Sequence, residues 1–258
     1  WHLMPIKGKK GNNMHKFGVV SVSFRKHTAE EILEASQKAG LSYIEWGSDV
    51  HAPYDNLPNL ERIAVLQEKY GIKCSSYGTY FKVGETPTEL LEKYIDAAEI
   101  LGTNILRLWC GNKNSEDYGE DEKAQLFKEC KKAAEIAAKR NAVLCMECHR
   151  FTYTNKREAA LELMKEVNSD SFKMYWQPGE FRSIDENEQY AADIAEHTKI
   201  IHAFKWKGNM RYKLSEGADE WKRYMAYFPE DITLLLEFMP DDRIESLKEE
   251  ADALKSFF

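Results

Sequence analysis

Several features that would assign this chain to a specialised class are missing from its 258 residues. No stretch approaches the roughly 20 consecutive apolar residues that a membrane span requires. The first residues show no apolar segment followed by the small-residue cleavage site of a secretory signal. We therefore expect a cytoplasmic protein with no membrane partner.

Cysteine is sparse, and the five that occur are odd in number. Most lie within apolar runs, which is typical of buried reduced thiols rather than of a disulfide framework. Cys145 and Cys148 form a CxxC pair, but an offset of three along a strand points their side chains to opposite faces. A shared metal or redox role for this pair is therefore disfavoured.

An excess of basic residues is also absent, since the formal net charge is −7. Nucleic-acid binding depends on basic surface that neutralises phosphates, so we expect no nucleic-acid partner. The composition, 43% hydrophobic and 31% charged, is that of an ordinary globular protein. Disorder is thereby disfavoured.

What the chain does have is a regular alternation of apolar strand-like runs and helical segments. A capping-box pattern from Thr28 to Glu31 opens the first helix, which ends at Gly40. The predicted strands are 17–24, 43–46, 73–81, 104–110, 142–147, 172–177, 199–205 and 233–238. The later helices are 57–70, 87–101, 121–140, 156–167, 187–197, 218–227 and 242–258.

Eight strand-then-helix units imply parallel strands with right-handed crossovers, and their number and length predict a single (β/α)8 TIM barrel of the α/β class. A doubly wound open sheet is the alternative, but no GxGxxG follows the first strand. We assign the barrel to residues 14–258. Residues 1–13, rich in Lys, Gly and Asn, are interpreted as a flexible leader or tag remnant.

The most informative stretch runs from 142 to 150, where an apolar strand ends in Glu147 and His149. Side chains alternate along a strand, so these two share one side and one pocket. Two further apolar runs carry His202 and Glu237 near their ends. Burying unpaired charge costs several kcal/mol or more, so these groups need compensation, which a divalent metal ion would supply.

In a TIM barrel the active site is built at the carboxyl ends of the strands. Polar or aromatic candidates follow or end most strands of this chain. They are Glu45, His51, Arg107, Trp109, Glu147, His149, Gln177, Glu180, His202, Lys205 and Glu237. Two carboxylates, an imidazole and an amide oxygen suit one Mn²⁺, Mg²⁺, Co²⁺ or, less comfortably, Zn²⁺ ion. Arg107 would bind either a substrate anion or Glu147.

Segments 39–46, 106–111, 146–149, 201–205 and 235–237 together resemble the xylose isomerase-like TIM barrels, the sugar phosphate isomerase/epimerase superfamily. The resemblance runs from about Phe17 to the C-terminus. It implies a metal site formed by Glu147, Gln177, His202 and Glu237. The family usually has aspartate where this chain has Gln177, and often histidine at Glu180. A glutamine carbonyl brings no charge, so the metal affinity is expected to be lower.

The resemblance implies a metal-dependent sugar or sugar phosphate isomerase or epimerase, in which Glu147 and Glu237 move a proton beside a ketose carbonyl. The remaining candidates, predicted to bind substrate, are Glu45, His51, Arg107, Trp109, His149, Glu180 and Lys205. The alternative is a non-catalytic sugar-binding or regulatory barrel whose metal site is degenerate. A DNA-repair endonuclease of this superfamily is disfavoured, because only seven histidines occur and the chain is acidic. A homodimer is a further expectation.

Overall fold

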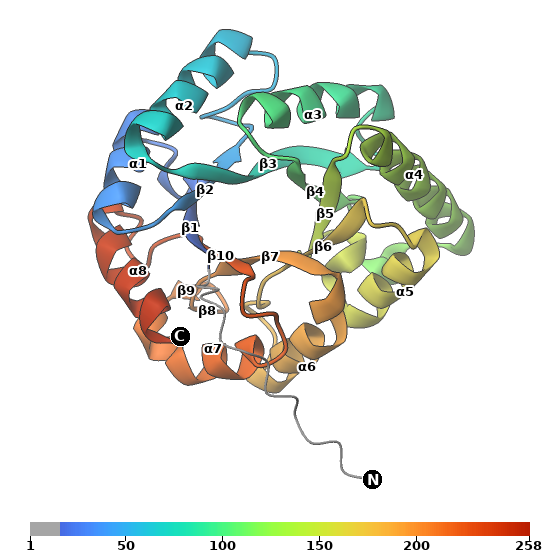
Figure 1. Ribbon diagram of the computed structural model, residues 1–258. Coiled ribbons are helices and arrows are strands. Elements are labelled where there is room, and N and C mark those ends of the chain that lie inside the picture. Colours follow the sequence, from blue (N-terminus) through green and yellow to red (C-terminus); the bar gives the residue numbers. More distant parts are fainter. Residues whose placement is uncertain (1–15) are drawn as a thin grey trace, which may run out of the picture.

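A computed structural model describes residues 16–258 and contains the predicted barrel. Eight parallel strands close in the order β1-β10-β7-β6-β5-β4-β3-β2, and the helices form an outer ring around them (Figure 1). The β1–β10 pair closes the barrel, with Phe17 opposite Leu234. The single (β/α)8 barrel is confirmed. The predicted leader at 1–13 lies outside the described residues.

The strands are short, and most of their residues are buried because both faces are covered. The barrel strands are β1 (Lys16–Val20), β2 (Tyr43–Gly47), β3 (Lys73–Val83), β4 (Ile105–Cys110), β5 (Val143–Glu147), β6 (Phe172–Trp176), β7 (Thr198–Ala203) and β10 (Thr233–Leu236). Side chains that point outward pack against the helices and make up the larger hydrophobic cluster. A smaller cluster, which includes Val20, Cys145, Tyr175 and Leu235, lies on the inner side of the strands.

Local signals place the helices as the sequence predicts. The Thr28 side chain accepts from the Glu31 backbone N–H in a reciprocal capping box, and Gly71 ends α2 with a φ of 66°. The α-helices are α1 (Ala29–Lys38), α2 (Leu57–Tyr70), α3 (Leu91–Ile100), α4 (Glu120–Lys139), α5 (Arg157–Val167), α6 (Ile184–Ile194), α7 (Ala218–Met225) and α8 (Leu247–Ser256).

Several boundaries differ from the prediction, and the last helix begins at Leu247 rather than at 242 because a 3-10 turn, Ile244–Ser246, precedes it. The first strand stops at Val20, and Ser21–Phe24 forms a 3-10 helix. Helix α6 begins three residues earlier than predicted, because Ser183 caps it. A hairpin of β8 (Trp206–Lys207) and β9 (Met210–Arg211) follows β7 and was not predicted. Its turn contains Gly208 at a φ of 59°, and the Gly-Asn pair there is a hairpin signal that would have found it.

The cysteines lie in the protein interior. All five cysteines are buried free thiols, and Cys145 and Cys148 belong to different clusters on opposite faces of the strand, as predicted. Within residues 16–258, none of the helices combines the length and the apolar character needed to cross a membrane.

Candidate active site

Three ionisable residues from three strands meet at the carboxyl end of the barrel. Glu147 ends β5, His202 lies on β7 and Glu237 directly follows β10. Their exposed fractions are 3%, 0% and 8%. One carboxylate oxygen from each glutamate and one ring nitrogen of His202 all lie within 4.8 Å of one another. The strand ends therefore bring together the three residues predicted to bind metal through charged or imidazole groups.

The surroundings of His202 Nδ1 fit a cation better than a hydrogen bond. This nitrogen lies 3.1 Å from Gln177 Oε1, 3.5 Å from Glu147 Oε1 and 3.5 Å from Glu237 Oε2. A ring nitrogen carries at most one hydrogen, so it cannot satisfy three acceptors. Neighbouring ligands at about 2.1 Å from a divalent ion and at right angles to each other are about 3 Å apart. Gln177 thus lies where the fourth predicted ligand should be.

Glu45 was predicted to bind substrate, but the structure buries it completely beneath His202, so it does not reach the cavity. Its Oε1 accepts from Arg107 Nε at 2.9 Å, and its Oε2 accepts from the Tyr175 hydroxyl at 2.6 Å and the Ser76 hydroxyl at 2.9 Å. His202 Nε2 lies 3.6 Å from the same Oε2. The prediction for Glu45 is therefore corrected to a role behind the histidine.

Arg107 joins this buried carboxylate to the site. Its NH1 donates to Glu147 Oε2 at 2.6 Å, and the Trp109 indole N–H donates to the same oxygen. Of the two partners considered for Arg107, the structure shows Glu147, with Glu45 as a second one. Charge-assisted hydrogen bonds of this kind fix the orientation of a carboxylate. Glu147 is therefore held by two donors, with its other oxygen turned toward His202.

The buried charges shift one another's pKa values. Burial opposes ionisation of Glu45, but Arg107 and His202 outweigh it and lower the pKa of Glu45 to about 2. Burial likewise disfavours a charged His202, but the carboxylates of Glu237, Glu45 and Glu147 raise its pKa to about 10. Arg107 lowers the pKa of Glu147 against its burial, whereas burial raises the pKa of Glu237. The pKa values of Glu147 and Glu237, which both line the cavity, are thus shifted in opposite directions.

A cavity of about 340 Å³ opens above these residues. It is lined by Val22, Arg25, Tyr80, Arg107, Trp109, Glu147, His149, Arg150, Gln177, Glu180, Phe204, Trp206, Glu237 and Phe238. Glu147 and His149 share it, as the alternation predicts. The Nδ1 of His149 lies 2.6 Å from the Arg150 carbonyl oxygen, so this nitrogen carries the hydrogen and Nε2 is an acceptor when the ring is neutral.

Two predicted substrate-binding residues lie elsewhere. His51 packs against the Trp46 ring, with its Nε2 3.0 Å from the His27 carbonyl oxygen. Lys205 pairs with Glu220 on α7. Neither residue lines the cavity. Both follow the regular part of a strand, where the loop rather than the barrel sets the direction of the side chain.

The cavity also contains residues that the sequence did not single out for binding. Arg25 follows the first predicted strand and Arg150 follows His149, so their position just past a strand end was a usable signal. Phe238, at the end of the last predicted strand, lines the cavity with a φ of 51°. The aromatic side chains of Tyr80 and Trp206 line it as well.

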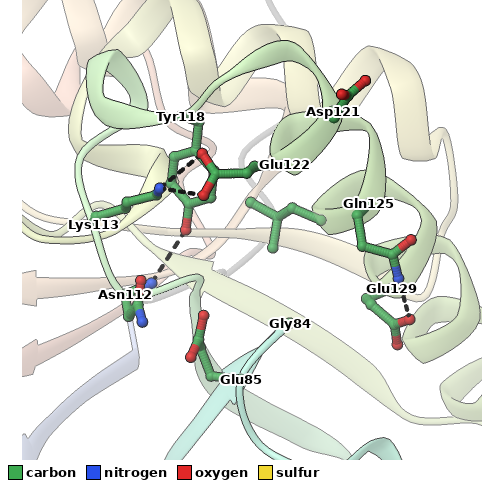
Figure 2. Close-up of a pocket in the computed structure, with 10 residues that line it drawn as sticks. Gly84, Glu85, Asn112, Lys113, Tyr118, Asp121, Glu122, Gln125 and Glu129 are labelled. Carbon is green, nitrogen blue, oxygen red and sulfur yellow. Dashed lines mark hydrogen bonds and ion pairs between the residues drawn. The ribbon is translucent and has the colours of Figure 1, made fainter.

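A larger hollow of about 690 Å³ lies beside α4 and offers less chemistry (Figure 2). Its lining includes Glu85, Asp121, Glu122 and Glu129 together with Lys113. Lys113 donates to both oxygens of Glu122, and Glu129 accepts from Gln125 (Figure 2). Several of its polar groups therefore bind one another. The smaller cavity is the one beside which Glu147, His202 and Glu237 converge.

Residues 33–257 match the family model described as the xylose isomerase-like TIM barrel. The chain belongs to this family. Among curated proteins it is 23% identical over 168 residues to the 3-dehydroshikimate dehydratase of Bacillus anthracis, which covers 62% of this chain and 60% of that protein. The chain thus spans only about three fifths of the length of this relative.

Solved structures of low sequence identity share the family fold. The probable 3-DHS dehydratase of Bacillus anthracis has a TM-score of 0.79 at 18% identity, with 93% of this chain and 98% of that chain covered. The D-psicose 3-epimerase of Clostridium cellulolyticum H10, in a structure with D-tagatose, has a TM-score of 0.71 at 12% identity, with 93% and 97% covered. These similarities show the fold of this chain. Its chemistry depends on its own residues.

Proposed function

We propose that this protein is a divalent-metal-dependent isomerase or epimerase of a small sugar or sugar phosphate. The observation that carries the proposal is the meeting of Glu147, His202 and Glu237 at the strand ends, where the two glutamates line a cavity and His202 lies buried beneath them. The three oxygens around His202 Nδ1 fit one divalent ion, which would be held by these residues and Gln177. Such an ion polarises a bound carbonyl and stabilises the negative charge that develops on it.

The two glutamates supply the proton chemistry. Glu147 stays ionised because Arg107 holds its pKa down, whereas burial raises the pKa of Glu237 and favours its protonated form. One of the two, as a carboxylate, removes the proton from the carbon beside the carbonyl and becomes a carboxylic acid. The other, starting protonated, delivers its own proton to the opposite face of that carbon, which inverts the centre, or to the neighbouring carbon, which moves the carbonyl. Trp109 and Arg107 keep Glu147 in position during the transfer.

Solvent isotope exchange tests this function. In D₂O with Mn²⁺ or Co²⁺, we expect deuterium to enter D-psicose, D-tagatose or L-ribulose at the carbon beside the carbonyl, as followed by proton NMR. Removal of the metal with EDTA should stop the exchange, and added Mn²⁺ should restore it. Exchange that continues at the same rate in EDTA would contradict the metal dependence.

Removal of the same proton can also begin the loss of a neighbouring hydroxyl as water, and a relative in the family is named as a dehydratase. The two outcomes are separable in one sample, because an epimer retains all its hydroxyls and a dehydration product gains a conjugated carbonyl that absorbs in the ultraviolet.

The non-catalytic sugar-binding barrel is the second candidate function. The specific observation that favours it is Gln177, which brings no charge to the proposed ligand set.

Replacing Gln177 by glutamate should strengthen metal binding. The side chains have the same shape, and the added charge would lie beside His202 Nδ1, so we expect the Kd for Mn²⁺ to fall about tenfold. Titration calorimetry measures it. Gln37→Glu adds the same charge on exposed α1 and should leave the Kd unchanged. A Gln177→Glu variant with unaltered or weaker affinity would mean that this position is not a ligand.

A further inference from the structure

The arginines of the cavity are already paired, which bears on the charge of the substrate. Arg25 donates from Nε to Asp49 Oδ2 at 2.6 Å and from NH1 to the Val22 carbonyl oxygen at 3.1 Å, and it also donates to the Tyr80 hydroxyl. Asp49 accepts from Tyr80 as well. Arg25 is thus fixed in place with its charge balanced by a carboxylate beside it.

Arg150 has a similar arrangement on the other loops. Its NH1 lies 3.3 Å from Glu180 Oε1, and its guanidinium lies over the rings of Phe151 and Phe181 at 5.7 and 5.5 Å. The loop that carries Glu180 is tied to the hairpin, because the Gly208 N–H donates to the Glu180 carbonyl oxygen at 2.7 Å. The side chain of Glu180 therefore faces Arg150 from an anchored loop.

The charges of the side chains that line the cavity, together with those of the carboxylates paired with them, sum to zero once a divalent ion is included. Three positive side chains line the cavity, namely Arg25, Arg107 and Arg150. Five carboxylates line it or bind these arginines, namely Glu45, Asp49, Glu147, Glu180 and Glu237. The difference is two negative charges, which one divalent cation neutralises when His202 is neutral, as an imidazole that binds a metal must be. A bound dianionic phosphate would give the cavity and its partners an excess of negative charge.

The loops that bind phosphate in many TIM barrels, after the last two strands, are likewise paired here. Lys205 pairs with Glu220, and Arg211 of the hairpin pairs with Asp242 while lying over the Trp206 ring. Lys82 has its Nζ 5.5 Å from the Trp109 ring centroid and does not line the cavity. Lys205 and Arg211 are therefore paired, and Lys82 lies outside the cavity.

We infer that the substrate is an uncharged polyhydroxy ketone rather than a phosphorylated or otherwise dianionic one. This inference rests on the proposed function for the class of reaction, but the charge argument concerns binding alone. The cavity of about 340 Å³ lies at the small end of the range for ligand pockets, which suits an unmodified sugar.

The first test compares each ketose with its own phosphate ester on the Mn²⁺-loaded protein. The pairs are D-fructose with its 6-phosphate, D-tagatose with its 6-phosphate and D-ribulose with its 5-phosphate. We expect kcat/KM for deuterium exchange to be at least about tenfold higher for the uncharged member of any pair that reacts. An ester that reacts faster than its parent ketose would overturn the inference.

The second test frees one arginine. In Glu180→Gln, Arg150 loses its carboxylate, so the ratio of kcat/KM for the ester to that for the ketose should rise roughly two- to fivefold. The matched control, Glu220→Gln, removes the same charge next to Lys205 outside the cavity and should leave the ratio unchanged. An equal rise in both variants, or in neither, would mean that Glu180 does not screen the substrate.

Failure of the proposed function is distinguishable from failure of this inference. If no ketose exchanges deuterium, calorimetric titration of the same pairs into the Mn²⁺-loaded protein still measures the preference. Tighter binding of the uncharged ketose without exchange would uphold the inference and reject the isomerase. Tighter binding of the ester, or no binding of either member, would reject the uncharged substrate.

Discussion

Replacing Glu147 by glutamine is expected to lower turnover about 10³- to 10⁴-fold, as measured by deuterium exchange into the best ketose. The substitution removes a carboxylate that both lines the cavity and faces His202, and in the proposed function this carboxylate is a proton-transfer group and a metal-binding group at once. The new amide also places an N–H₂ group or a weaker acceptor in front of Arg107 and Trp109, which now donate to a charged oxygen.

The loss must be separated from unfolding. Glu237→Gln should also lower deuterium exchange, by a factor of at least about 10². Among the described residues, the nearest charged donor to the Glu237 carboxylate is His202 Nδ1 at 3.5 Å, so this substitution disturbs fewer contacts than Glu147→Gln. Thermal melts of both variants should show one cooperative transition. Glu147→Gln that is folded and still exchanges deuterium within tenfold of the parent protein would remove Glu147 from the mechanism.

Replacing Arg107 by methionine is expected to lower the free energy of unfolding by about 3–5 kcal/mol. Arg107 is 3% exposed and neutralises two buried carboxylates, so its loss leaves Glu45 and Glu147 facing each other in the barrel with His202 as the remaining cation. Chemical denaturation measures the change. Arg25→Met removes an ion pair from an arginine whose side chain is 41% exposed, and it should cost less, about 1 kcal/mol.

The pH dependence gives a second signature of the same network. The pKa of Glu45 is about 2 in the folded protein, below its ordinary value of about 4.3 in an unfolded chain. The stabilisation is therefore complete above about pH 4.3 and is lost as the pH falls from there toward 2. The Arg107→Met variant should show a flatter dependence in that window. An equal cost for Arg107→Met and Arg25→Met, with identical acid profiles, would contradict the role given to Arg107.

The barrel and the residues that converge at its strand ends could be predicted from the sequence because both depend on short-range rules. Strand–helix alternation fixed the fold, and each strand end marked a place where the side chains converge. Glu147, His202 and Glu237 were found because an ionisable group inside an apolar run is costly unless compensated. Gln177 was grouped with His202 through the family resemblance, and its Oε1 lies 3.1 Å from His202 Nδ1.

The other residues depend on depth and loop geometry, which periodicity does not encode. Glu45 has the right direction for the barrel interior, but its level in the barrel puts it under His202 rather than in the cavity. Lys205 comes two residues after β7 ends, so the turn into the hairpin directs it to Glu220. Arg25 reaches the cavity from the 3-10 helix that replaced the end of the first predicted strand.

The most direct test of the account is the metal content of the purified protein, measured by mass spectrometry beside that of His202→Ala. His202 supplies the nitrogen around which the three oxygens gather, so the parent protein should bind close to one equivalent of Mn²⁺, Co²⁺, Zn²⁺ or Mg²⁺ and the variant much less. A parent protein that remains free of metal after incubation with excess Mn²⁺ would contradict the account and favour the non-catalytic sugar-binding barrel.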